Sequence, residues 1–305
     1  MRTLLLIALL FSPALVTAKA LNVEFKFTPF TGDPKNDTVE SVPGKARVIL
    51  NNVPIAEQEV ERREVPVMFE AREIAPAVWV PAQSLGPSVR KGKNTIRFEF
   101  EPEDPSVEYR AQLRWASVTD QVREQREPGQ YKGTNQADEG VDEKTVTGRL
   151  SIEREFTADF AIDQPWHHLP PVTTLSDEDR QALAAKVLER VEWFKPDFAA
   201  IYKQLAATQG VEVAEIRKRK CLEAAHKAGV HVSAAPRGDL EFVTTGGPEV
   251  IVRAKRGELY PPDRTAFERI KGDEMQMCAG MALAVAYPQR LVAVRTPQGN
   301  WEVVY

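Results

Sequence analysis

Alternating apolar and polar residues dominate the first half of the chain. The alternating runs lie at 21–28, 48–55, 65–69, 95–101, 109–115 and 146–156. A period of two predicts strands that bury one face. The Asn51-Asn52 pair and the Lys91–Asn94 segment are typical turn sequences between such strands. Short strands separated by regular turns predict an all-β antiparallel sandwich over residues 21–162.

The alternation stops between residues 120 and 144. This segment contains seven acidic residues, four basic residues and one aromatic residue, Tyr131. Because such a polar segment can bury little surface, we expect a flexible loop that joins two neighbouring strands. The loop either recognises a partner, with Tyr131 as a candidate binding residue, or has no role of its own.

Part of this half resembles a known class of module. The sequences VILNNVPIAE and LGPSVRKGKNTIRFEF, between Lys45 and Phe100, resemble jelly-roll sugar-binding (galactose-binding-like) modules. Asn-Asn stands where that family usually has Asn-Gly, and a GxN turn also occurs in immunoglobulin-like sandwiches. The resemblance implies a sandwich and hints at a carbohydrate ligand. Trp79 and Trp115 would then stack on a sugar, although sandwich cores also use tryptophan.

Helical periodicity replaces the alternation after a Pro-rich linker at 163–175. Ser176 is a typical N-cap, followed by three acidic residues that complement a helix N-terminus. Apolar spacing predicts three helices, at 176–195, 198–209 and 213–228. A hairpin at 240–252 and strands at 291–293 and 301–305 come later. We therefore expect an α+β domain at 176–305, with three helices followed by an antiparallel sheet.

The segment 275–287 alternates large residues at odd positions with small residues at even positions. We interpret it as a strand whose small face packs against a helix or borders a cavity. Cys278 lies on the small face, and Cys221 lies on the third predicted helix. These are the only two cysteines, and we expect them to form a disulfide. Two separate buried thiols are the alternative.

The second half also has a family resemblance. Helices followed by a sheet that ends in GNWEVVY resemble the nuclear-transport-factor-like cone fold, over residues 176–305. That resemblance implies a conical pocket between the helices and the sheet. The family uses such pockets both for catalysis and for binding.

The first twenty residues have the features of a signal peptide. Arg2 precedes an apolar stretch, and Ala18-Lys19-Ala20 is an A-x-A cleavage site. A membrane anchor is the alternative, but the apolar run is shorter than the roughly 20 residues that a span needs. We therefore expect a periplasmic or secreted protein with no membrane span after cleavage, in a compartment that permits disulfides.

Composition and charge narrow the function classes. The chain has 305 residues, of which 43% are hydrophobic and 28% charged, as in soluble globular proteins. The net charge is −4, and it becomes −6 when cleavage removes Arg2 and Lys19. This charge argues against a nucleic-acid partner, so we interpret the basic run at 217–220 as a solvated surface.

Little chemistry is visible in the sequence. It has no phosphate-binding, dinucleotide-binding or zinc motif, so we expect no cofactor and no metal site. His167 and His168 are adjacent and would face opposite ways on an extended chain. His226 is the one candidate catalytic residue, and its alternative role is to cap a helix C-terminus.

We expect an exported, non-catalytic binding protein that recognises a partner protein, a carbohydrate or a small ligand. It would bind through the sandwich, through a pocket in the α+β domain, or through both. The alternative is an exported hydrolase or isomerase that uses a conical pocket in the second domain.

Overall fold

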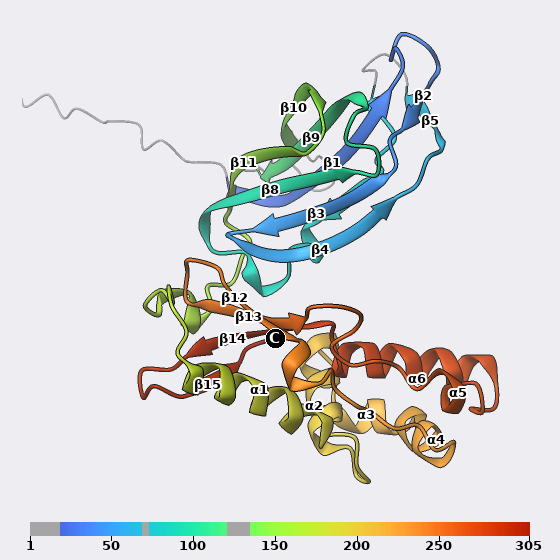
Figure 1. Cartoon of the computed structure of the whole chain (residues 1–305), viewed down its shortest axis with the longest axis vertical. Coiled ribbons are helices and arrows are strands. Elements are labelled where there is room, and N and C mark those ends of the chain that lie inside the picture. Colours follow the sequence, from blue (N-terminus) through green and yellow to red (C-terminus); the bar gives the residue numbers. More distant parts are fainter. Residues whose placement is uncertain (1–18, 69–72, 121–134) are drawn as a thin grey trace, which may run out of the picture. The chain divides into compact units, whose positions relative to one another are not determined.

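The computed structural model describes residues 19–68, 73–120 and 135–305 (Figure 1). The fold is mixed, with mostly antiparallel sheets and several helices. It divides into two compact units. The first unit contains residues up to 50 together with 54–162, and the second contains 51–53 together with 163–305.

Two antiparallel sheets build the first unit. Its elements are β1 (Lys19–Thr31), β2 (Thr38–Ser41), β3 (Gly44–Leu50), β4 (Val53–Val60), β5 (Glu64–Met68), β6 (Glu73–Ile74), β7 (Val78–Pro81), η1 (Ala82–Ser88), β8 (Gly92–Pro102), β9 (Glu108–Asp120), β10 (Asn135–Thr147) and β11 (Leu150–Ala158). One sheet has the order β10-β9-β1-β2-β5-β6, with β7 also paired to β1. The other has the order β11-β8-β3-β4.

The two sheets share one hydrophobic core. Apolar residues from the predicted alternating runs of β1, β3, β8 and β9 all contribute to it. The ring of Phe27 stacks on that of Phe98 at 5.4 Å between centroids, and Phe100 meets Tyr109 edge-on at 5.5 Å. Asn51 and Asn52 adopt positive φ values of 50° and 67° and form the predicted turn between β3 and β4.

The expectation of a flexible loop over 120–144 is wrong where the structure describes that segment. Strand β10 begins at Asn135 and pairs with β9 along its whole length. Ion pairs stabilise this polar edge strand: Asp142 lies 3.2 Å from Arg154, and Glu143 lies 3.5 Å from Arg110. The next strand, β11, pairs with β8 in the other sheet and is therefore not a neighbour of β9. Tyr131 lies outside the described residues.

The second unit combines helices with a four-stranded antiparallel sheet of order β12-β13-β14-β15. Its elements are η2 (Pro165–His168), α1 (Asp177–Val191), α2 (Ala199–Gln209), α3 (Val213–Arg217), α4 (Cys221–Lys227), η3 (Arg237–Asp239), β12 (Leu240–Thr244), β13 (Glu249–Ala254), α5 (Arg264–Phe267), α6 (Asp273–Ala286), β14 (Arg290–Arg295) and β15 (Trp301–Val303). Helices α5 and α6 stand between β13 and β14, so the expected order of three helices followed by a sheet is wrong.

Two further expectations about this unit are corrected. The third predicted helix is two short helices, α3 and α4, because Lys220 between them adopts a left-handed φ of 54°. The segment 275–287, expected to be a strand, lies almost wholly in helix α6. Its Ala, Met and Leu residues have high helix propensity, and Asp273 and Glu274 in its first turn complement the helix dipole.

The core of the second unit lies on one face of its sheet. Helices α1, α2 and α6 gather on that side (Figure 1) and bury Leu183, Ile201 and Ala286 against Val250 and Leu291. Neighbouring residues of β13 and β14 point to the opposite face, as strand geometry requires. Of the α6 residues that were expected on a strand, Ala282 and Ala286 belong to this core.

Candidate functional site

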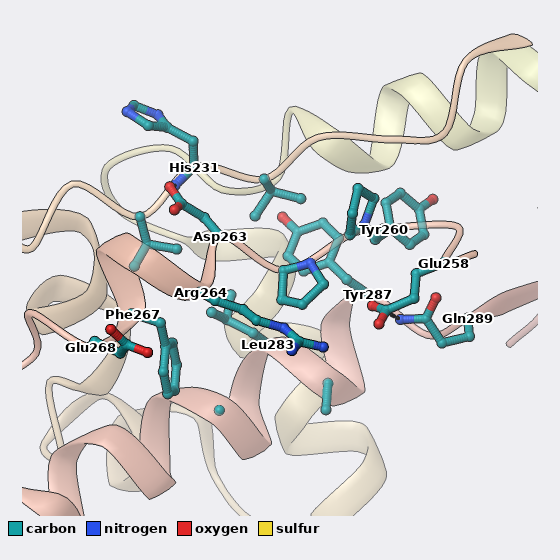
Figure 2. A pocket seen from close by; sticks show the side chains of 16 residues that line it. His231, Glu258, Tyr260, Asp263, Arg264, Phe267, Glu268, Leu283, Tyr287 and Gln289 are labelled. Carbon is teal, nitrogen blue, oxygen red and sulfur yellow. Dashed lines mark hydrogen bonds between the residues drawn. The ribbon is translucent and has the colours of Figure 1, made fainter.

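A cavity of about 410 Å³ lies within the second unit. Two helices, α5 and α6, form part of its wall, and the segments 230–232 and 258–263 form most of the rest, together with Glu268, Tyr287 and Gln289. Figure 2 shows the side chains that line it. No residue of strands β12 to β15 is among the lining residues. The cavity therefore belongs to the helices and loops and not to the face of the sheet.

Small residues on α6 create the space. Gly280 and Ala284 line the cavity, one turn apart on the helix. A Cβ atom at Gly280 would lie 3.1 Å from Cζ of Phe267 on the opposite wall. The even positions that the sequence grouped on one small face are thus divided by the helix. Ala282 and Ala286 pack into the core, whereas Gly280 and Ala284 border the cavity.

Aromatic and aliphatic side chains form the deeper wall. Tyr260 and Tyr287 are buried and meet edge-on, with ring centroids 5.4 Å apart. The Tyr260 hydroxyl donates a hydrogen bond to the Val187 carbonyl at 3.2 Å. Burial raises the pKa of both tyrosine hydroxyls far above the ordinary value. Both phenols therefore stay protonated at neutral pH and present ring surface to the cavity.

The charged and amide side chains of the lining lie at the rim, and Asp263, Glu258 and Gln289 among them have structural partners. The Asp263 carboxylate caps α5 by accepting the Ala266 amide at 3.1 Å. Gln289 accepts the Leu259 amide at 2.8 Å and donates to Glu258 at 3.3 Å. Figure 2 shows Asp263 and Glu258 at separate places on this rim. The site is an apolar pocket with a charged edge, and the carboxylates of Asp263 and Glu258 contact groups of the local fold.

His226, the catalytic candidate, does not line this cavity. It lies in the last turn of α4 with an exposed side chain. Its ring is 6.1 Å from that of Phe194 and 5.9 Å from that of Phe198. His231 does line the cavity, although no sequence pattern singles it out for that place. A catalytic role for His226 stays a prediction.

The two candidate tryptophans lie on opposite faces of the first unit's larger sheet. Trp115 pairs with Phe25 and Trp79 pairs with Lys26, and successive residues of β1 point to opposite faces. Trp79 is 57% exposed and donates to Glu24 at 3.1 Å. Trp115 packs at the edge of the core, beneath the Arg154 guanidinium at 3.9 Å. One ligand cannot stack on both rings.

The expected disulfide is present. Cys221 at the start of α4 and Cys278 within α6 are bonded, with Cα atoms 5.8 Å apart. The pairing was predicted correctly, although Cys278 lies on a helix and not on the strand from which it was argued. The bond holds together two helices, and the second of these lines the cavity.

The two adjacent histidines do not face opposite ways. His167 and His168 lie in the 3-10 turn η2, where both contact the carboxylate of Asp163, at 3.1 Å and 2.7 Å. These two hydrogen bonds hold the pKa of Asp163 below its ordinary value. In the part of the chain that the structure describes, no three His, Cys, Asp or Glu side chains are placed to hold a metal ion.

Comparisons with known proteins give no match: no family model, no curated protein and no solved structure corresponds to this chain. Both resemblances argued from the sequence therefore stay predictions. Among the described helices, none has the length and apolarity needed to cross a membrane.

Proposed function

We propose that this chain is an exported, non-catalytic binding protein whose second unit holds a small apolar ligand. The cavity beside α5 and α6 is the observation that carries the proposal. Its volume of about 410 Å³ falls in the range of small-molecule sites, roughly 300–1,000 Å³. Apolar walls with a few polar groups at the rim are also typical of such sites.

The chemistry of the walls favours binding over catalysis. The buried tyrosines remain protonated and are far from acting as bases at neutral pH. The Asp263 carboxylate accepts the Ala266 amide of α5 and the His231 amide of the segment 230–232. The small residues of α6 supply space and offer no nucleophile. The hydrolase or isomerase alternative instead predicts turnover that His226→Ala abolishes without unfolding the protein.

We infer that the first unit is a β-sandwich module that contributes contacts with a partner or a carbohydrate. The core shared by its two sheets supports this assignment. The exposed Trp79 ring is its candidate contact, whereas Trp115 is the less accessible of the two. The likeness of the second unit to the cone fold stays a prediction. That fold would place a pocket between the helices and the sheet, whereas this cavity lies beside α5 and α6.

Filling the cavity tests the proposed function. Ala284 is exposed, lies in the last turn of α6 and lines the cavity, so Ala284→Trp should fill the space without disturbing the core. We expect the neutral fluorescent probe N-phenyl-1-naphthylamine to bind the native protein with enhanced emission. In Ala284→Trp its affinity should fall at least tenfold, while the melting temperature changes by only a few degrees.

Met281→Trp is the matched control. Met281 lies on the same helix, is 55% exposed, and is not among the lining residues. This variant adds the same indole outside the cavity and should bind the probe as the native protein does. Equal loss in both variants, or no saturable binding to the native protein, would overturn the proposal.

A further inference from the structure

Arg190 is a buried cation at the end of α1. Only 4% of its surface is exposed, although it sits in the last turn of a helix whose outer face is highly charged. Burying a charge without a partner is costly, so buried arginines are normally paired with carboxylates. Arg190 therefore needs an explanation in terms of its surroundings.

Its contacts among the described residues include no carboxylate. The Nε–H donates to the Ala286 carbonyl at 2.5 Å, at the C-terminus of α6. The guanidinium carbon lies 4.5 Å from the Trp193 ring centroid. Burial lowers the pKa of the guanidinium, and the titratable groups nearest to it are the hydroxyls of Tyr260 and Tyr287, which are neutral at neutral pH. Arg295 and Arg253, by contrast, each have an acidic partner.

A role as a helix C-cap accounts for only part of this side chain. The contact with Ala286 uses the Nε–H alone. The two terminal nitrogens carry four further N–H groups in a fixed planar fork, and they have no hydrogen-bond acceptor among the residues that the structure describes. Such a fork matches the two oxygens of a carboxylate.

A second cavity gives solvent access to Arg190. It measures about 190 Å³ and is distinct from the larger one, since the two share no lining residue. The side chains that line it include Lys186, Glu189, Arg190, Trp193, Gln204 and Glu302. Lys186 is already paired with Glu189 at 2.8 Å. Arg190 is thus the cation that remains for a ligand.

We propose that this second cavity binds the carboxylate of a small organic acid, with the Arg190 guanidinium as its anchor. The Trp193 ring and Val303 offer apolar surface to the body of the acid. Glu189 and Glu302 also border the cavity, and their charges disfavour a dianion such as phosphate. A singly charged carboxylate is the class that fits both the fork and these neighbours.

Calorimetric titration with sodium benzoate, at constant ionic strength held with sodium chloride, tests the proposal. We expect saturable binding at a single site of the full-length oxidised protein. Arg190→Lys keeps the charge but loses the fork, and should weaken binding about tenfold. Sodium phosphate titrated in the same way should bind more weakly than benzoate.

Variants on α2 keep the test independent of whether Arg190→Lys folds. Gln204 lines the cavity, so Gln204→Trp should fill it and abolish benzoate binding. Gln209→Trp, on an exposed position of the same helix, should bind benzoate normally. Ala284→Trp should also leave benzoate binding unchanged, which separates this site from the larger cavity.

Three results would overturn the proposal. The first is absence of saturable benzoate binding to the native protein. The second is equal binding by Gln204→Trp and Gln209→Trp. The third is tighter binding of phosphate than of benzoate, which would contradict the ligand class.

Discussion

At the scale of single residues, Asp179 links segments that are far apart in the chain. Its carboxylate accepts the Ser176 amide at 2.9 Å and the Trp301 indole N–H at 3.0 Å, and it pairs with Arg295 at 2.5 Å. Ser176 in turn accepts the Asp179 amide, which completes a capping box. The sequence predicted the N-cap from local pattern, but the contact with Trp301 spans 122 residues and has no local signal.

Asp179→Asn should lower the free energy of unfolding by about 1–2 kcal/mol, because it weakens a helix cap and removes the charge that Arg295 meets. Burial acts to raise the pKa of Asp179, but hydrogen bonds from Ser176, Trp301 and Arg295 outweigh it and leave the pKa below its ordinary value. A lowered pKa gives stability that is present above pH ~4 and lost as the pH falls through the folded-state value.

Urea unfolding between pH 2 and pH 7 measures this contribution. The native protein should lose stability on acidification more steeply than Asp179→Asn. Asp177→Asn, in the same first turn, is the control and should cost only a few tenths of a kcal/mol. The same acid dependence in native protein and Asp179→Asn would show that this carboxylate contributes nothing.

At the scale of elements, strands with a buried face were predictable and two other segments were not. In β1 and β8 the alternation reflects burial directly, since Phe25, Phe27 and Phe98 enter the core. Strand β10 lies at the edge of its sheet and carries exposed charged residues. Its sequence therefore has no alternation of apolar and polar residues that would predict a strand. In α6, an alternation of side-chain size suggested a strand, although residue size carries no such meaning when Ala and Met both favour helices.

The candidate site shows the same limit. The small residues of 275–287 did signal a cavity or a close approach, and Gly280 and Ala284 do line one. The opposite wall comes from Phe267 and the 258–263 segment, whose position depends on tertiary packing and on the cap at Asp263. The disulfide was predictable because the chain has only two cysteines, which leave a single pairing, and because the predicted export would permit it.

The Cys221–Cys278 bond should stabilise the second unit substantially. It closes a loop with a sequence separation of 57 residues, for which the chain-entropy model gives about 4 kcal/mol. We expect the double variant Cys221→Ser/Cys278→Ser to unfold at a lower urea concentration when the helical circular dichroism signal is followed. The same result should follow from mild reduction of the native protein, and an unchanged midpoint in both would contradict the expectation.

At the scale of the whole molecule, the two units have separate cores and different secondary structure. The first is built mainly from strands, and the second carries the two cavities for which we propose ligands. A binding protein organised in this way would assign partner contacts to one unit and ligand capture to the other. Export would allow the disulfide in the second unit to form.

Export is testable on the whole protein. We expect the chain purified from the periplasm or from the culture medium to begin at Leu21 and to have 285 residues. Intact-mass measurement should also show the loss of two hydrogens that the disulfide requires. A chain that retains Met1, or one recovered with two free thiols, would contradict the expectation.

Strand β1 begins at Lys19, before the predicted cleavage point. Lys19 pairs with Asp120 and Ala20 with Thr119, and the register shifts between Ala20 and Asn22. A signal peptidase needs its substrate extended and unpaired, whereas the bond after Ala20 lies within this ladder. Folding and processing of the proposed precursor would therefore compete in time. If the predicted leader is removed, its removal would have to precede pairing of β1, because a precursor that folded early would protect its own leader.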